Sequence, residues 1–403
     1  MNRLPQDLVS KILTKLPVKE LSKCKSICKS WLDLITNPYF ITNYYIIYNI
    51  KQEHLFVIRR PFLCGLKTYI SILSWNLNVR SGSDYLASEL LNPPYEYNSD
   101  HKYWTEIMGP CNGIYFLEGN PNVLMNPSLR EFMVLCQSHF TLPNGFYSFT
   151  EYYGFGYDSK SDDYKVVVLK DLWLKENDER ENGYWNCELY SFNSNSWRKI
   201  DVEKLPLPFD IYGSSRIYTF VKNCYHWWGF VDSNIGDVVL AFNMVDEMFR
   251  KIKVPKIEYL NRSSEFECEC FKTLVPFDEC DTIGVIVYPV RGLEKWFDVW
   301  VMKDYWDEGS WIKLYSVGPV PVIYKLVGFY GSNRFLWKGS NERLVLYEGE
   351  NDNIRYLQVY GKYDSIRAAR YMESLVSLQR GNESSRRCFS CSLVPDPLLN
   401  PGE

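Results

Sequence analysis

The chain is poor in the side chains and motifs that most enzymes use for catalysis. It has four histidines in 403 residues and no Gly-x-Ser-x-Gly segment, which excludes the nucleophile elbow of a serine hydrolase. Gly154-Phe155-Gly156 begins like a dinucleotide-binding loop, but the third glycine and the strand–helix context are missing. We therefore predict a protein that is not an enzyme, with no catalytic residue and no cofactor.

Metal-ligand patterns are equally sparse. Cys388-Phe389-Ser390-Cys391 has the spacing of half a zinc site, and Cys268, Cys270 and Cys280 form a second group, but no histidine joins either. His226 lies in the apolar run Tyr225-His226-Trp227-Trp228, which favours a hydrogen-bonded core histidine over a general base. No metal is predicted.

Long apolar runs are also missing. No stretch of about 18 apolar residues occurs, so we predict no membrane span. The chain begins with a polar segment, and its 12 cysteines are scattered, which is typical of reduced thiols in a cytoplasmic protein. The sequons at Asn261 and Asn382 are then chance matches.

What the N-terminal residues do contain is a helical pattern with little room for a core of its own. Leu4, Leu8 and Ile12 repeat every four residues, and Leu13 and Leu16 lie on the adjoining edge. Pro5 suits a first helical turn and Pro17 is expected to end the helix. A second stripe follows at Cys24, Cys28, Trp31 and Ile35. A unit this short must pack against a neighbouring domain or a partner chain to be stable.

This segment resembles the F-box. The residues that fit are Leu4-Pro5, Leu8-Val9, Ile12-Leu13, Leu16-Pro17, Lys19, Leu21, Lys25–Trp31, Leu34-Ile35 and Pro38–Phe40, whereas Ser22 and Cys24 stand where members usually carry Leu and Phe. The resemblance implies docking on a Skp-type adaptor and, through it, on a cullin scaffold. The residues assigned to adaptor binding are Leu4, Pro5, Leu8, Ile12, Leu13, Leu16, Pro17, Leu21, Cys28 and Trp31.

Charge favours an acidic partner for this segment. Residues 1–31 carry Arg3 and six lysines against Asp7 and Glu20, a balance of +5 in a chain of net charge −4. A basic helix face would also suit nucleic acid, but no aromatic residue interleaves the lysines before Trp31, so nucleic acid is not predicted as a partner.

After about residue 45 the pattern changes to short extended runs. They are Tyr44–Ile50, His54–Arg59, Lys67–Leu73, Lys165–Leu169, Asp237–Phe242, Thr282–Tyr288 and Asp298–Met302, separated by Gly, Asn, Asp and Pro. The aromatic content of 16% also favours strands. The overall class is α+β, a small helical unit followed by an all-β sandwich, barrel or propeller.

A weak repeat favours a propeller. Each unit is an apolar strand, a polar turn and a returning strand with an aromatic residue: Val123–Phe132, Leu189–Arg198, Leu240–Arg250 and, more loosely, Val299–Ile312. The turns at Asn126, Asn193 and Asn243 have spacings near the kelch period of about 50 residues. We expect a kelch-like β-propeller of six or seven blades, with a β-sandwich as the alternative. The aromatic residues Phe132, Trp197, Phe249 and Trp311 should be buried at equivalent places.

The same region is similar to the F-box-associated domain of plant F-box proteins, in particular to the S-locus F-box proteins of pollen. The segments that carry this similarity are Gly109–Gly113, Gly154–Asp158, Asp163–Val167, Asn195–Arg198, Glu247–Ile252, Asp298–Lys303, Ser310–Ile312 and Tyr371–Leu378. The resemblance implies the substrate-recruiting subunit of an SCF ubiquitin ligase, with a pistil S-RNase as its target in self-incompatibility. The expected domains are an F-box at 1–44, a propeller at 45–380 and a flexible tail at 381–403.

Acidic loops are the clue to the target. Residues 258–281 hold seven carboxylates against Arg262 and Lys272, a balance of −5. The residues assigned to substrate binding are Glu265, Glu267, Glu269, Asp304, Tyr305, Trp306 and Asp307. Clustered carboxylates attract basic proteins, so a basic target is predicted. The alternative reading is an F-box propeller that binds a small ligand or glycan, or acts as a scaffold.

Overall fold

The structure is a computed structural model of the whole chain. It describes residues 5–51, 55–61, 68–75, 85–91, 106–176, 180–201, 210–211, 217–231, 234–257, 270–277, 281–292, 294–321, 323–331, 333–339, 341–349, 351–360 and 366–379. The chain divides into two compact units, one of residues 1–135 and 361–403 and the other of residues 136–360.

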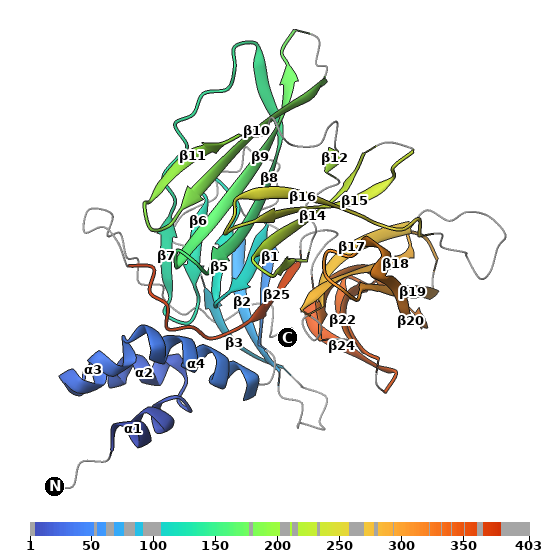
Figure 1. Cartoon of the computed structure of the whole chain (residues 1–403). Helices are drawn as coiled ribbons and strands as arrows, with labels where there is room; N and C mark the ends of the chain where they lie inside the picture. The colour runs from blue at the N-terminus through green and yellow to red at the C-terminus, as the bar shows by residue number, and fades with distance from the viewer. Residues whose placement is uncertain are drawn as a thin grey trace. The chain divides into compact units, whose positions relative to one another are not determined.

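Among its described residues, the first unit opens with four helices (Figure 1). They are α1 (Gln6–Leu13), α2 (Val18–Cys24), α3 (Lys29–Ile35) and α4 (Pro38–Lys51). Pro5 and Pro17 precede α1 and α2 directly, so Pro17 begins the second helix rather than ending the first. The predicted second stripe is divided, because Cys24 ends α2 and Cys28 precedes α3.

The prediction of an extended run at Tyr44–Ile50 is wrong, since these residues belong to α4. Their aromatic and β-branched side chains favour a strand locally. However, Phe40, Tyr44 and Tyr48 recur every four residues and are all buried against the other helices. Burial of this stripe outweighs the local preference, as tertiary packing often does.

The described part of the first unit also contains two antiparallel sheets. One has the order β25 (Arg367–Tyr371), β1 (Leu55–Pro61), β2 (Thr68–Trp75) and β3 (Tyr85–Leu91), and the other is β4 (Ile107–Cys111), β5 (Ile114–Leu117), β6 (Val123–Asn126) and β7 (Glu131–Val134). The first of these combines strands from both ends of the chain, with Val57 opposite Ala369.

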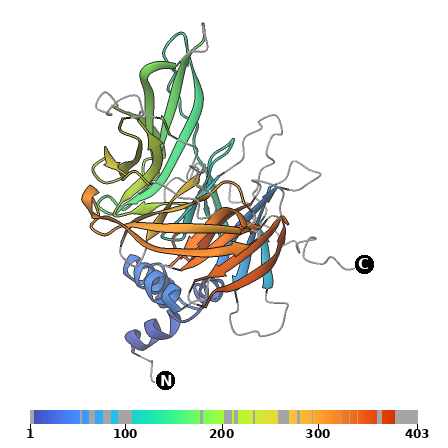
Figure 2. The same cartoon turned by 90° about the vertical axis from the view of Figure 1, so that its right-hand side faces the viewer.

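As far as the structure describes it, the second unit contains four sheets. Their strands are β8 (Phe146–Asp158), β9 (Asp163–Leu174), β10 (Arg180–Ser191) and β11 (Ser196–Ile200); β12 (Asp210–Ile211), β13 (Phe220–Val221), β14 (Cys224–Phe230), β15 (Asp237–Asn243) and β16 (Met248–Lys253); β17 (Cys270–Phe277), β18 (Thr282–Pro289), β19 (Glu294–Met302) and β20 (Trp311–Pro321); and β21 (Ile323–Tyr330), β22 (Arg334–Gly339), β23 (Arg343–Glu348) and β24 (Asn353–Tyr360). The short helix η2 (Glu308–Ser310) precedes β20. In Figures 1 and 2 the long green strands β8–β10 form a ribbon that extends beyond the short β11.

Small sheets of consecutive antiparallel strands are typical of propeller blades and not of a sandwich. Five of the sheets among the described residues are built from consecutive strands, and the remaining one is the composite of β25 with β1–β3. The expectation of six or seven blades was therefore too high, since five blades in the described part of the chain are built from consecutive strands. The strand pattern alone did not show that the two ends of the chain share the remaining sheet. The predicted runs at Lys165–Leu169, Asp237–Phe242, Thr282–Tyr288 and Asp298–Met302 are confirmed as strands.

The predicted repeat corresponds to a recurring turn between the third and fourth strands of a sheet. Asn126 pairs with Glu131, Ser191 with Ser196 and Asn243 with Met248, so each turn spans the same number of residues. The residue before the fourth strand has a positive φ in each case: 56° at Arg130, 47° at Asn195 and 55° at Glu247. The equivalent of Asn126 is thus Ser191, whose hydroxyl accepts from the Ser194 amide, and not Asn193 as the repeat pattern predicted.

The four repeat aromatics all lie on fourth strands. Phe132, Trp197 and Phe249 are each the second residue of β7, β11 and β16, whereas Trp311 begins β20 after the longer turn that contains η2. Phe132, Trp197 and Trp311 are buried and Phe249 is half-buried. The equivalent placement is therefore confirmed for Phe132, Trp197 and Phe249, and the longer turn shifts Trp311. The predicted burial is confirmed for Phe132, Trp197 and Trp311 but is wrong for Phe249.

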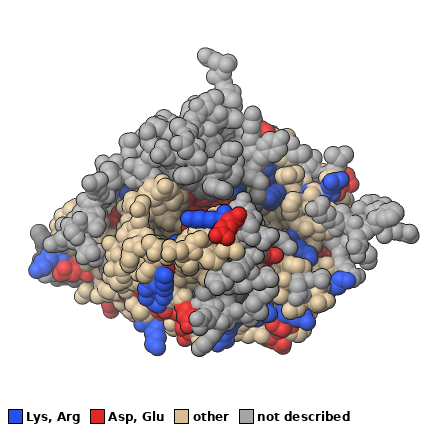
Figure 3. Space-filling model, turned by 90° about the horizontal axis from the view of Figure 1, so that it is seen from above, with Lys and Arg blue, Asp and Glu red and all other residues tan. Residues whose placement is uncertain are grey.

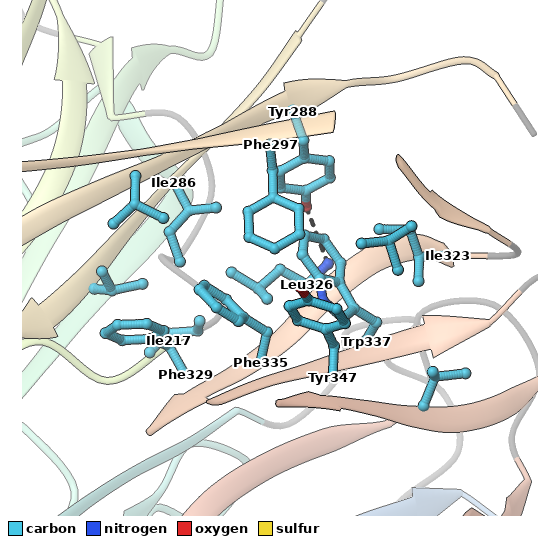
Figure 4. Close-up of a cluster of buried hydrophobic side chains, with 14 of the residues drawn as sticks. Ile217, Ile286, Tyr288, Phe297, Ile323, Leu326, Phe329, Phe335, Trp337 and Tyr347 are labelled. Carbon is cyan, nitrogen blue, oxygen red and sulfur yellow. Dashed lines mark hydrogen bonds between the residues drawn. The ribbon is translucent and has the colours of Figure 1, made fainter. Parts of the chain in front are cut away.

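Aromatic side chains fill the core of the second unit, as Figure 4 shows for the sheets β17–β20 and β21–β24. Tyr288 and Trp337 meet edge to face with ring centroids 5.0 Å apart, and Phe297 and Phe335 lie 4.7 Å apart. The Tyr288 hydroxyl accepts a hydrogen bond of 3.1 Å from the Leu326 amide. The high aromatic content of the sequence is therefore used largely for packing between strands.

A buried ion network joins two of these sheets. The Lys165 ammonium on β9 donates to the Asp158 carboxylate at 2.7 Å, the Glu247 carboxylate at 2.8 Å and the Met244 carbonyl at 2.8 Å. Burial opposes ionisation of Asp158, but the hydrogen bonds from Lys165 and Ser161 outweigh it and lower its pKa to about 2. The turn before β16 is thereby tied to the hairpin β8–β9.

Candidate adaptor-docking and target-binding surfaces

The helices of the first unit have a small buried core. Leu13, Val18, Leu21, Ile35 and Tyr44 are at most 1% exposed within it. Leu13 and Leu21 were predicted to contact an adaptor. The structure corrects both assignments, because these side chains are 1% and 0% exposed and pack in the core formed by α1–α4.

Other members of the predicted adaptor set remain accessible. Leu8 and Ile12 on α1 are 46% and 53% exposed, and Pro5 and Cys28 are exposed as well. Leu16, Pro17 and Trp31 are half-buried against the core, and Leu4 lies outside the described residues. The exposed pair Leu8 and Ile12 is one helical turn apart and forms an unpartnered apolar strip among the described residues.

Sequence reasoning missed five further exposed apolar residues in the described helical unit. Ile27 is 63% exposed, Leu32 40%, Tyr39 78%, Ile46 51% and Ile47 42%. All except Ile27 are adjacent in sequence to a buried or half-buried residue, such as Trp31 or Phe40. A search for helical periodicity therefore selects those core residues and passes over the exposed ones. Exposed apolar side chains of this number on so small a unit indicate a docking surface.

The helices are held by a segment from the far end of the chain, Met372–Gln379, which we name the strap (the red coil beside α4 in Figure 1). One carboxylate oxygen of Glu373 accepts from the Val18 amide at 2.7 Å and from the Tyr44 hydroxyl at 3.1 Å. Asn49 pairs with the backbone of Glu373, donating to its carbonyl and accepting from its amide, both at 2.9 Å.

The other side of the strap is bonded to the sheet β4–β7. Asn126 donates to the carbonyls of Ser374 at 3.1 Å and Val376 at 2.6 Å. The Glu131 carboxylate accepts from the Leu378 amide at 2.7 Å. Burial raises the pKa of Glu131, a change that the hydrogen bonds from Leu378 and Ser377 only partly offset.

Four of the seven predicted target-binding residues lie in the turn between β19 and β20. Tyr305 and Trp306 are half-buried against the core of the neighbouring strands, while Asp304 and Asp307 are exposed. Asp307 accepts from the Gly309 amide at 2.9 Å, and Glu308 accepts from the Lys253 amide at 2.7 Å. The turn is therefore a fixed structure, and its two aromatic residues serve partly to anchor it.

A buried histidine holds this turn. His226 Nδ1 lies 3.2 Å from the Thr219 carbonyl and Nε2 lies 2.8 Å from the Tyr305 hydroxyl. A carbonyl only accepts, so Nδ1 carries the proton and Tyr305 donates to Nε2. Complete burial lowers the pKa of His226 to about 4, so the ring is neutral. The prediction of a core histidine at this position fits the geometry.

The surroundings of this turn carry both charges. Lys222 lies 3.8 Å from Asp281 and over the Tyr305 ring, and Arg250 lies over the Trp306 ring at 5.1 Å. On the face drawn in Figure 3, acidic and basic side chains are interspersed over the described surface. Glu265, Glu267 and Glu269 lie outside the described residues.

In the described part of the chain, no group of three His, Cys, Asp or Glu side chains is placed to hold a metal ion. None of the helices described above is both long and apolar enough to cross a membrane.

Comparison with known proteins identifies the class. The F-box domain profile matches residues 1–43, and the profile of the F-box associated beta propeller domain matches residues 65–396. The chain therefore belongs to the F-box associated β-propeller family. An N-terminal F-box followed by an all-β propeller is thus its architecture, and an F-box implies binding to a Skp-type adaptor and a cullin scaffold.

Its relatives are plant F-box proteins. F-box protein CPR1 of Arabidopsis thaliana is 26% identical over 93% of this chain and 89% of its own length. An F-box/kelch-repeat protein of the same plant is 24% identical over 78% of this chain and 80% of its own. Among solved structures, an oligogalacturonate lyase in complex with manganese aligns with 74% of this chain and 77% of its own at 11% identity and a TM-score of 0.36. The names of these two plant relatives do not refer to the S-locus, so the comparisons do not support the resemblance to S-locus F-box proteins.

Proposed function

We propose that the protein is the substrate-recruiting subunit of an SCF-type ubiquitin ligase, in which the helical unit docks on a Skp-type adaptor and the propeller binds a protein target. The observation that carries this proposal is the pair Leu8 and Ile12, which is exposed on α1 while Leu13 and Leu21 fill the core. In this role the chain acts as an adaptor, and its partners carry out ubiquitin transfer.

The test compares a surface variant with a core variant. Leu8→Ala with Ile12→Ala should weaken binding of a purified Skp-type adaptor about 30-fold or more, since central apolar contacts dominate such interfaces. Hydrogen exchange of α2–α4 should stay as in the wild type, because neither side chain is buried. Leu13→Ala should instead speed that exchange. Wild-type affinity in the double variant would contradict the assignment.

The narrower form of the proposal, a basic S-RNase as the target, rests on the sequence resemblance and on the acidic residues at 258–281. Its test is whether a purified S-RNase binds the protein and is ubiquitinated in a reconstituted ligase. If the reconstituted ligase ubiquitinates other bound proteins but never an S-RNase, the adaptor function stands and the proposal of an S-RNase as the target is contradicted.

A second candidate, binding of a glycan, is favoured by one observation. Phe149 on the β8–β9 ribbon is 55% exposed and stacks on Trp173 with ring centroids 4.4 Å apart. Exposed aromatic faces of this kind suit sugar rings. A glycan array with the wild type and Phe149→Ala separates this activity from the recruitment of a protein.

A further inference from the structure

The hydrophobic core of the F-box is not complete within its own residues. Leu375 of the strap is 2% exposed and lies in the same buried cluster as Leu13, Leu21 and Tyr44. The strap is 355 residues away in sequence from the F-box position that it contacts at Val18. A helical unit of this size cannot bury enough apolar surface alone, so the contribution of Leu375 matters.

The strap also supplies a cap that the F-box lacks. The residue before α2 is Pro17, which makes no side-chain capping bond, and α2 has only seven residues. The Glu373 carboxylate takes this place by accepting from the Val18 amide at 2.7 Å. An anionic acceptor at a helix N-terminus satisfies an unpaired amide and interacts favourably with the helix dipole.

Two more contacts fix the long helix α4 to the same residue. The Tyr44 hydroxyl is shared between the Glu373 carboxylate and the Leu16 carbonyl, both at 3.1 Å. Asn49 makes its paired hydrogen bonds to the Glu373 backbone, and it is itself 7% exposed. Glu373 therefore joins α2 and α4 at one point.

The strap takes this position by binding the sheet β4–β7. Asn126 and Glu131, at the turn between β6 and β7, hold its backbone. Gly113, at a φ of +77°, leaves the space that the strap occupies, since a Cβ there would lie 2.4 Å from the Ser374 Cβ. The F-box, the strap and this sheet thus form one continuous set of contacts within the first unit.

From these contacts we infer that the strap controls adaptor binding: the F-box is competent to dock only when Met372–Gln379 is seated between the helices and β4–β7. The inference rests on the proposed function, because it takes the F-box as the adaptor-binding element. A chain that is unfinished or cleaved before residue 372 would lack the cap and Leu375. The adaptor would then discriminate in favour of chains whose propeller and C-terminal segment have folded.

The test uses full-length variants and a purified Skp-type adaptor. Glu373→Ala and Leu375→Ala should each raise the Kd for the adaptor by about 10- to 100-fold, because the docking-competent population falls by that factor. Glu373→Gln keeps one carbonyl acceptor and should lie between Glu373→Ala and the wild type. Glu176→Ala, an exposed carboxylate in the second unit, is the matched control and should bind as the wild type does.

Hydrogen exchange separates this role from a general loss of stability. In Glu373→Ala, amides of α2–α4 should exchange faster while those of β15 keep their wild-type rates. The inference is overturned if the variants bind the adaptor with wild-type affinity, if affinity falls with α2–α4 protection unchanged, or if β15 loses protection equally. Absence of adaptor binding by the wild type itself would instead overturn the proposed function.

Discussion

Single polar residues hold the irregular parts of this protein in place. The half-buried Glu373 binds two helices of the F-box, and the fully buried His226 binds the turn that carries Tyr305. Both residues stand in runs whose sequence pattern indicates packing only. Their partners are 355 and 79 residues away, so the hydrogen bonds follow from the fold and were not predictable from sequence neighbours.

His226 gives a prediction about pH. Its pKa is about 4 in the folded protein and near 6.5 when unfolded, so between these values only the unfolded chain takes up the proton. The free energy of unfolding should therefore fall as the pH is lowered from about 6.5 towards 4, by at most about 1.4 kcal/mol per pH unit from this residue. Urea unfolding between pH 7 and pH 4.5 measures the slope.

Two variants attribute the slope to this ring. His226→Gln should reduce it, whatever its effect on stability at pH 7, because the amide does not titrate. His139→Gln, which changes an exposed histidine, should retain it. Equal slopes in His226→Gln and the wild type would show that other groups produce the pH dependence.

At the scale of elements, the turn before each fourth strand is the feature that the sequence revealed best. The polar opening and the aromatic at the return were visible in Asn126–Phe132 and Asn243–Phe249. The position with positive φ was not visible, because it is filled by Arg130, Asn195 and Glu247, which share no chemistry. The same turn connects β23 and β24, with φ 49° at Asp352, and was missed since Ile354 replaces the aromatic.

The aromatic residues after these turns should differ in their contribution to stability. Trp197 is 6% exposed and its indole N–H donates to the Cys136 carbonyl at 2.7 Å, whereas Phe249 is only half-buried. Trp197→Ala should lower the free energy of unfolding by about 3–5 kcal/mol, and Phe249→Ala by clearly less. Urea unfolding of both variants checks the order, and a larger loss in Phe249→Ala would contradict it.

At the scale of the whole molecule, the sequence predicted the order of the parts and the family but not how the chain ends are used. The F-box and the propeller were recognisable from motifs and are matched by the family profiles. The pairing of β25 with β1 and the seating of the strap join segments from opposite ends of the chain. No local pattern encodes such pairings, so the blade number and the source of the F-box cap were not predictable.

The distribution of charge over the whole chain leads to the last prediction. The F-box segment 1–31 is basic at +5, and the remaining residues sum to −9 for a net charge of −4. The two proposed partners should therefore be drawn to different parts of the chain. Asp304 and Asp307 are exposed, and Glu265, Glu267 and Glu269 belong to the stretch with a balance of −5. If these carboxylates meet a basic target, they act mainly on the association rate.

Changing Glu265, Glu267 and Glu269 to Lys, alone or together with Asp304→Lys and Asp307→Lys, should slow association with a basic protein target in low salt and flatten its dependence on salt concentration. These variants lose the long-range electrostatic attraction to the target, so salt has less attraction to screen. The matched Glu→Gln triple variant, which removes charge without reversing it, should lie between them and the wild type.

Adaptor binding should be unchanged in all of these variants, because the basic F-box segment is untouched. Stopped-flow rates at several salt concentrations measure both effects, and a wild-type rate in low salt for the triple Lys variant would show that these carboxylates are only solvated.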